Sequence, residues 1–405
     1  MREAAVVTGL GVVGPQGIGR EALEAALVAG RSLASEMDRS AGYHAAESSR
    51  LAALVPKLDL GRWLPSAEAR RLSVPSRFAV AAARMALEDA GIASCEGRRV
   101  AVVLATAFGA LLFTEKLVRQ ILDEGPESAQ PFYFSECVAN AAAARVAVAL
   151  GARGANVTIA EREAGPLLAL ARGAYEVSSG RADVAIAGSA EEMTPLLHAL
   201  LDRFRGTARA SRDHDEASRP FDARRDGVLA GEGASVVVIE READAEARGA
   251  RPMARVAASV AAFDPTAPVS DWGDGHASLA GALRRGLARA GHGTETIDLI
   301  VSGASGARRG DRLEAATLAA TFGAAPIPPV VVPKAVTGEF GGGLLAAAVL
   351  ATEGAQFGGL ASFAKKDSAL AVAPHDGSPL KKPKRVLTTA LAPGGAAAWV
   401  LLERP

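Results

Sequence analysis

Short apolar runs alternate along the chain with segments whose apolar residues recur at helical spacing. This alternation predicts a layered α/β fold with buried sheets. In the first half the pattern predicts strands at residues 4–13, 99–106, 157–159, 182–188 and 234–240, and helices near 20–29, 76–90, the second half of 131–151, and 165–179. In the second half it predicts strands near 254–263, 297–302, 329–333, 385–391 and 396–403, and helices near 275–290, 310–322 and 341–351.

The second half repeats the order of these elements without a convincing repeat of residues. We therefore expect a pseudo-duplicated sandwich of sheets and helices, with one half at residues 1–245 and the other at 252–405. Residues 241–252, READAEARGARP, form the one plausible linker. Residues 205–219 and 356–384 are polar and are predicted to be loops.

The stretch 156–170, NVTIAEREAGPLLAL, is the most informative part of the chain. The β-branched residues 157–159 favour a strand, and the sequence from Gly165 favours the first turn of a helix, so Glu163 lies close to a helix N-terminus. Unpaired N–H groups and the helix dipole favour an anion there. A cysteine at such an elbow would be an activated thiolate, whereas a glutamate taken by itself is a residue that stabilises a helix start.

The composition excludes several classes of function. The 405 residues contain 45 Lys plus Arg and 45 Asp plus Glu, which leaves no net field to attract nucleic acid or an anionic membrane. Two cysteines, Cys95 and Cys137, give neither a disulfide framework nor a C-x-x-C pair, and the six histidines lack ligand spacing, so no metal is expected. No run reaches the roughly 20 apolar residues of a membrane span, and the N-terminus lacks a signal peptide pattern. The cytoplasm is the expected compartment.

Two recurrent types of motif, the glycine clusters and the arginine pairs, are interpreted as structural rather than functional features. Gly9, Gly11 and Gly14 follow a strand but do not form a dinucleotide-binding fingerprint, and no cofactor is expected. Gly341–Gly343 are expected to allow close packing at a helix start. The arginine pairs are interpreted as solvated faces, any one of which is an alternative docking site for an acidic carrier; they are Arg70-Arg71, Arg224-Arg225, Arg284-Arg285 and Arg308-Arg309.

Several segments together carry a resemblance to a known family: VVTGLGVVGPQG, SRFAVAAARMALEDAG, PFYFSECVAN at 131–140, GRADVAIAGSAEEMTP at 180–195, SRPFDARRDGVLAGEGASVVVIER at 218–241 and RVLTTALAPGGAAAWVLLER near the C-terminus. Over essentially the whole chain, the sequence resembles the β-ketoacyl synthases, the thiolase-fold condensing enzymes of fatty acid and polyketide synthesis. The resemblance implies a layered αβαβα sandwich.

The same resemblance locates the positions where the family carries its catalytic cysteine and two histidines. Aligning TIAEREAG with the family elbow places Glu163 at the cysteine, and aligning VSGASGAR with the HGTGT motif places Ala304 at the first histidine. Aligning PKAVTGEFGGG with the last motif retains Lys334 and places Glu339 at the second histidine. The condensing reaction requires a thiolate and paired N–H donors, so we expect it to fail.

The resemblance also locates the acyl tunnel and the dimer interface. Phe108, Leu111, Leu112, Phe113, Phe132, Tyr133 and Phe134 fall in segments that line them in the family, although core packing also explains several of these residues. In the family, the residue at the position of Tyr133 reaches across the two-fold into the partner subunit's pocket, so the resemblance implies a partner role for Phe108 and Tyr133. Where the family has a Gly-Phe-Gly-Gly gate, this chain has Ala392-Pro393-Gly394-Gly395, without the usual swinging phenylalanine.

We interpret Glu163, Lys334 and Glu339 as a buried ion cluster, since a buried charge without a partner is costly. A paired-carboxylate hydrolase would need one raised pKa and a water, for which the sequence offers no argument. The pattern resembles a chain length factor, the non-catalytic partner of an active ketosynthase in type II polyketide synthesis, and aryl polyene systems suit Glu163 at least as well as aromatic ones. Its expected partners are that ketosynthase and an acyl carrier protein. Open alternatives are a malonyl-carrier decarboxylase, a homodimeric scaffold, and a diverged enzyme with Glu163 as base.

Overall fold

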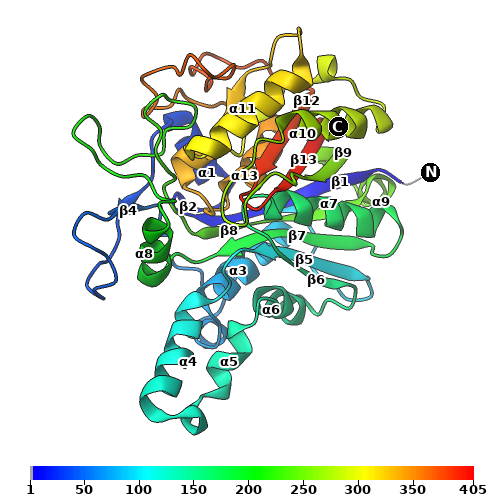
Figure 1. Cartoon of the computed structure of the whole chain (residues 1–405). Coiled ribbons are helices and arrows are strands. Elements are labelled where there is room, and N and C mark those ends of the chain that lie inside the picture. The colour runs from blue at the N-terminus through cyan, green and yellow to red at the C-terminus, as the bar shows by residue number, and fades with distance from the viewer. Residues whose placement is uncertain (1–2) are drawn as a thin grey trace.

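The computed structural model describes residues 3–405, and its strands form two sets of five that meet at the middle of one continuous sheet (Figure 1). The first set is β1 (Ala5–Gly14), β5 (Val100–Thr106), β6 (Asn156–Ala160), β7 (Val184–Glu191) and β8 (Gly233–Arg241). The second set is β9 (Ala254–Phe263), β10 (Leu299–Val301), β11 (Val330–Val331), β12 (Arg385–Leu391) and β13 (Ala396–Glu403). Short strands β2 (Gly17–Ile18), β3 (Ser35–Glu36) and β4 (Leu51–Ala52) lie outside both sets.

The two sets share one topology. Reading outward from the centre, the order is β1-β8-β7-β5-β6 in the first set and β9-β13-β12-β10-β11 in the second, which is the first, fifth, fourth, second and third strand of each. Within residues 3–405, strands of the two sets pair with each other only where Val6 and Val7 of β1 lie opposite Arg255 and Ala254 of β9. The predicted pseudo-duplication is therefore confirmed at the level of topology.

The two sets of five strands, called here the first and the second sheet, are each covered by layers of helices. The longer helices are α1 (Arg20–Ala29), α3 (Val74–Asp89), α4 (Leu111–Glu124), α6 (Ala141–Leu150), α7 (Gly165–Ser178), α8 (Pro195–Arg203), α10 (His276–Arg289), α11 (Arg308–Phe322) and α13 (Gly343–Glu353). The shorter ones are α2 (Ser66–Ala69), α5 (Pro131–Cys137), α9 (Glu242–Ala247) and α12 (Lys334–Thr337), with 3₁₀ turns at Pro126–Ser128 and Thr294–Thr296.

The central layer consists of α7 and α13, which occupy equivalent places in the two halves and contact strands of both sheets. Nearly every residue of α13, GLLAAAVLATE, is buried, as expected for a helix that is apolar all round. Helices α3 and α6 cover the outer face of the first sheet, and α10 and α11 cover the second. The result is the predicted αβαβα sandwich.

The segment predicted to be a linker, residues 241–252, contains the short helix α9, and Arg241 at its start forms ion pairs with Asp183 at 3.6 Å and Asp244 at 2.5 Å. One sequence-based expectation is wrong: Arg225, predicted to lie on a solvated face, is buried and pairs with Asp367 at 2.7 Å. At Arg225, charge taken as a sign of solvation is paired instead. The boundary between the two halves stays a prediction.

No helix within residues 3–405 has the length and apolarity needed to cross a membrane. In that same range, no group of three or more His, Cys, Asp or Glu side chains is arranged to hold a metal ion.

The contact between β1 and α3 gives a stability prediction. A Cβ added at Gly11 would lie 1.9 Å from the Ala82 carbonyl oxygen, so Gly11→Ala must push α3 off the sheet. We expect a loss of about 2–3 kcal/mol in the free energy of unfolding, measured by urea titration. The control is Gly281→Ala in α10, where the nearest atom is the flexible end of Arg285 and a gain of up to about 1 kcal/mol is expected. Equal effects would refute the close-packing argument.

Candidate functional site

The strand β6 and the helix α7 are joined by a tight turn that carries Arg162 and Glu163. The helix starts against the sheet, since a Cβ at Gly165 would lie 2.9 Å from the Cβ of Ala105 in β5. The turn points Glu163 into the interior, where its side chain is 9% exposed. The elbow predicted from the sequence is therefore present, with Glu163 just before the helix N-terminus.

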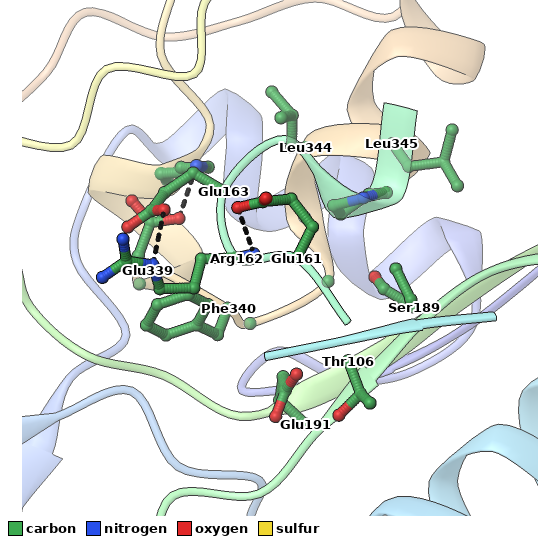
Figure 2. Close-up of a pocket in the computed structure, with 17 residues that line it drawn as sticks. Thr106, Glu161, Arg162, Glu163, Ser189, Glu191, Glu339, Phe340, Leu344 and Leu345 are labelled. Atoms are coloured by element: carbon green, nitrogen blue, oxygen red, sulfur yellow. Dashed lines mark hydrogen bonds and ion pairs between the residues drawn. The ribbon is translucent and has the colours of Figure 1, made fainter. Parts of the chain in front are cut away.

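The equivalent turn in the second half lies beside it. Lys334 begins α12 after β11, and Glu339 follows α12 just before α13. The Lys334 Nζ forms a short ion pair with Glu339 Oε1, and both side chains are almost fully buried. Glu163, Lys334 and Glu339 line one pocket, so the structure brings the three predicted charged residues together (Figure 2).

The charge state of Glu163 follows from this environment. Burial raises the pKa of its carboxyl to about 7, and the negative charge of Glu339 acts in the same direction. Lys334 and Arg162 lower the pKa but do not cancel these effects, since Lys334 is already paired and the Arg162 Nε lies 3.9 Å from Glu163 Oε2. Glu163 is consequently near half protonation at neutral pH.

Two carboxylate oxygens of the cluster lack hydrogen-bond partners. They are Oε2 of Glu163 and Oε2 of Glu339, and neither finds a donor within residues 3–405. The inner pocket beside them, which Thr106, Ser189 and Glu191 also line, has a volume of about 30 Å³. That is room for a water molecule, which is the usual partner of such buried oxygens.

A third carboxylate near Lys334 was not found from the sequence. Glu314 on α11 accepts hydrogen bonds from Ser302 Oγ at 2.5 Å and from the Thr389 hydroxyl, and burial raises its pKa. The positive charge of Lys334 lowers the pKa of Glu314. The feature of the sequence that could have pointed to Glu314 is its position on the buried face of an amphipathic helix.

A larger outer pocket of about 430 Å³ shares Arg162, Glu163, Glu339 and Phe340 with the inner one. Its remaining walls are mainly apolar and are formed by Phe108, Leu111, Leu197, Leu200, Leu201, Phe204, Val228, Trp272 and Pro393. The Arg162 guanidinium donates to the Pro393 carbonyl at 2.5 Å, which ties the elbow to the turn between β12 and β13. The turn between β12 and β13 therefore lies against the part of the pocket that Arg162, Glu163 and Glu339 line, which we call the charged floor.

Phe340 lies where the two pockets meet, and sequence reasoning missed it. Its φ of 70° puts a bulky side chain in the left-handed region, at a cost of about 1–2 kcal/mol. The ring packs edge-on against Phe108 with centroids 5.2 Å apart. Phe340 therefore lines both pockets, whereas the closing turn has Pro393 in place of the expected phenylalanine.

Buried carboxylates also fix the wall that carries Phe108. Glu191 accepts hydrogen bonds from the backbone N–H groups of Ala107 and Phe108, and Glu192 accepts one from Leu112 at 2.7 Å. Burial raises the pKa of each carboxyl to about 7. These hydrogen bonds hold the segment from Ala107 to Leu112 in place.

The other predicted residues lie elsewhere. Ala304 is buried in the turn between β10 and α11, where its N–H donates to Ser302 Oγ at 3.1 Å, and it lines neither pocket. Phe132, Tyr133 and Phe134 lie on α5, and Phe132 and Tyr133 pack against Phe113 of α4. Their assignment to a tunnel or an interface stays a prediction.

Comparison with known proteins gives matches across the chain. The family described as "Beta-ketoacyl synthase, N-terminal domain" matches residues 2–245, and "Beta-ketoacyl synthase, C-terminal domain" matches residues 253–352. A Streptomyces halstedii protein named "Putative polyketide beta-ketoacyl synthase 2" is 33% identical over 352 residues, which are 85% of this chain and 82% of the relative. A "3-oxoacyl-[acyl-carrier-protein] synthase 2" from Vibrio cholerae is 29% identical over 342 residues, 82% of this chain and 81% of that protein.

Among solved structures, "The ishigamide ketosynthase/chain length factor" matches with a TM-score of 0.89 and 28% identity, with both chains covered completely. A β-ketoacyl synthase from Burkholderia phymatum STM815 matches with a TM-score of 0.87 and 25% identity, again over the whole of both chains. The thiolase-like architecture expected from the sequence is thereby confirmed.

The raised pKa of Glu163 predicts how stability depends on pH. Its folded-state pKa of about 7 lies above the usual value of 4.5, so its ionisation opposes folding. No cost arises below pH 4.5, and the cost grows as pH rises to about 7, reaching up to about 3 kcal/mol.

We therefore expect Glu163→Gln to raise the free energy of unfolding by no more than about 1 kcal/mol at pH 5 and by about 3 kcal/mol at pH 8, measured by urea titration at both values. Glu246→Gln, at an exposed position of α9, is the control and should show no pH-dependent difference. A gain that is the same at both pH values would contradict the raised pKa.

Proposed function

Since the chain belongs to the β-ketoacyl synthase family, we propose that it is a non-condensing subunit of the chain-length-factor type, which pairs with an active ketosynthase in a type II polyketide synthase. The observation that carries the proposal is the carboxyl group of Glu163 at the elbow before α7. Of the residues that the structure describes, no cysteine or histidine lines either pocket around it.

The chemistry of condensation supports this proposal. The reaction needs a nucleophile that holds the acyl chain as a thioester and N–H donors that stabilise the developing enolate. An acyl group on Glu163 would be a labile anhydride, and the one nearby ammonium, Lys334, is paired with Glu339. Cys95 is buried and Cys137 lies at the end of α5, so neither replaces the missing thiolate.

Exposed apolar surface supports a protein partner. Helices α4 and α5 form an arm that projects from the body of the molecule (Figure 1). Large apolar side chains are exposed on this arm and on the adjoining α6, namely Val118, Leu122, Phe132, Phe134, Val138 and Val148. The neighbouring strand β6 lies at the edge of the sheet and, among the described strands, pairs only with β5. Such an edge is a template for pairing with another chain.

A solved relative described as a ketosynthase/chain length factor, 28% identical, makes a second ketosynthase-like chain the partner that we propose for this surface. An acyl carrier protein that delivers the growing chain completes the proposal. In this scheme Phe108, Leu112 and Tyr133 set how much room the partner's product has. A priming decarboxylase is disfavoured, because both pockets lack histidine.

The native mass of the protein purified from its own producing cells tests the pairing. We expect a one-to-one complex with a second ketosynthase-like chain. We expect Phe134→Asp to abolish this complex, because Phe134 is 64% exposed and the aspartate would place a charge in the apolar face. The matched control is Val28→Asp on α1, where the side chain is 53% exposed but distant from the arm in sequence. A homodimer would contradict the proposal and favour the homodimeric scaffold, whereas a one-to-one complex that Phe134→Asp leaves intact would contradict the assignment of the arm as the interface.

Restoring the nucleophile alone should not restore condensation. We expect Glu163→Cys to show no condensing activity with acyl and malonyl carriers, because Ala304 and Glu339 still supply no imidazole N–H donors. The readout is product formation by mass spectrometry, with the variant's circular dichroism as a control for folding. Condensation by this single variant would overturn the roles assigned to residues 304 and 339.

A further inference from the structure

We infer that residues 38–48 form an acid-sensitive strap, which the hydrogen bond between His44 and His198 holds against α8 at neutral pH and which protonation of this histidine pair releases. The strap lies within the loop that joins β3 to β4, at the edge of the molecule beside α8 (Figure 1). It consists of residues of this chain alone, so the inference does not depend on the proposed pairing.

Polar contacts hold the strap in place. Among the described residues 38–48, no apolar side chain is buried, and most of the residues are exposed. The Tyr43 hydroxyl donates a hydrogen bond to Glu115 of α4, and a ring nitrogen of His44 lies 2.9 Å from one of His198 on α8. The strap thereby links α4 of the arm to α8, a wall of the outer pocket. A segment with so little buried apolar surface can open locally while the rest of the protein stays folded.

The contacts of the two rings fix which nitrogens carry protons. The Leu51 carbonyl lies 3.2 Å from His198 Nε2 and can only accept, so this nitrogen carries the proton of the neutral ring. Nδ1 of His198 is then an acceptor, and His44 Nε2 donates to it across 2.9 Å. Nδ1 of His44 is left without a proton, and it is buried with no hydrogen-bond partner among the described residues.

A further proton on either ring disfavours the closed strap. On His198 it would go to Nδ1, which removes the only acceptor of the pair and leaves two N–H groups facing each other across 2.9 Å. On His44 it would go to the buried Nδ1, where none of the described residues supplies an acceptor. A charge would then be buried without a hydrogen bond, which is costly.

The charged groups around the pair do not compensate for this cost. Asp202 of α8 already accepts hydrogen bonds from Arg209 at 2.8 Å and from two uncharged donors. Glu216 already accepts from Ser49 Oγ at 2.5 Å and from two backbone N–H groups. Arg39, on the strap itself, adds a positive charge that opposes protonation of both rings.

The sign of the pH dependence follows. Burial lowers the pKa of both imidazoles below the usual 6.5, and Arg39 acts in the same direction. The negative charge of Asp202 raises the pKa of both rings without cancelling these effects. The contribution of a histidine with a lowered pKa is complete above pH 6.5 and is lost as pH falls below it. The strap is therefore closed at neutral pH and opens in acid with the uptake of one or two protons.

Hydrogen–deuterium exchange with mass spectrometry measures this opening. The protein, as purified with any partner that it retains, is compared at pH 7.5, 6.5 and 5.5, after correction for the pH dependence of chemical exchange. The reporter is a peptide that covers the strap and Ser49, whose N–H donates to Asp202. Between pH 7.5 and 5.5 we expect its protection factor to fall by about tenfold for uptake of one proton and up to about a hundredfold for two.

A peptide over β8 is the internal control. We expect it to stay protected at pH 5.5, because burial raises the pKa of Glu163 and Glu191 to about 7 and acid therefore removes the cost of their ionisation. Loss of protection over β8 at the same pH would mean global rather than local opening and would overturn the inference.

Three variants test the histidine pair. His44→Ala removes the donor and should lower the protection of the strap at pH 7.5 by about tenfold, with little further change in acid. His198→Gln keeps one acceptor and one donor but cannot be protonated, so the strap should stay closed at pH 7.5 and its acid release should shrink to about threefold or less. His276→Gln, at an exposed position at the start of α10, is the control and should leave the pH profile unchanged.

Three further results would overturn the inference: protection of the strap that does not change between pH 7.5 and 5.5, equal acid release in the unmodified protein and in His198→Gln, or full protection at pH 7.5 in His44→Ala. None of these results bears on the native mass, so failure of this inference and failure of the proposed pairing are distinguishable.

Discussion

The properties of the site depend on the buried charges that the two halves of the molecule contribute, which are one ammonium group and several carboxyl groups. One ammonium, on Lys334, faces the carboxyl groups of Glu339, Glu163 and Glu314, and its ion pair with Glu339 leaves the other two carboxyl groups without a full counter-charge. Burial therefore raises the pKa of both Glu163 and Glu314. Glu163 and Glu339 each keep one carboxylate oxygen without a hydrogen-bond partner among the described residues.

The duplicated topology explains why these groups meet. Helices α7 and α13 are equivalent elements of the two halves and pack together between the sheets. The turn before α7 carries Glu163, and the turn before α13 carries Glu339 and follows Lys334. Residues separated by about half the chain are consequently delivered to one pocket, and the closing turn of the second half, through Pro393, is tied to Arg162.

Much of this arrangement is predictable from the sequence, because buried strands and helix starts leave strong local patterns. The strand at 254–263 and the helix at 20–29 have the bounds expected from their patterns, and the elbow at Glu163 follows from β-branched residues giving way to a helical segment. The misses depend on long-range contacts. The pairing of Arg225 with Asp367 joins residues far apart in the chain, and the left-handed backbone of Phe340 is held by packing against Phe108. Neither contact can be predicted from the local sequence around the residue.

The polar floor of the pocket is not explained by stability. Replacing a buried ion pair by well-packed apolar residues is often neutral or stabilising, and the ionisation of Glu163 opposes folding above pH 7. At another surface or core position, a charged residue with such a cost could be replaced by one of many apolar residues of similar volume. The cost is carried here where an apolar pocket of about 430 Å³ meets the elbow, which has a carboxyl group and no cysteine. The carboxyl group of Glu163 therefore destabilises the folded state at neutral pH, and the stability of the fold does not account for its presence at the elbow.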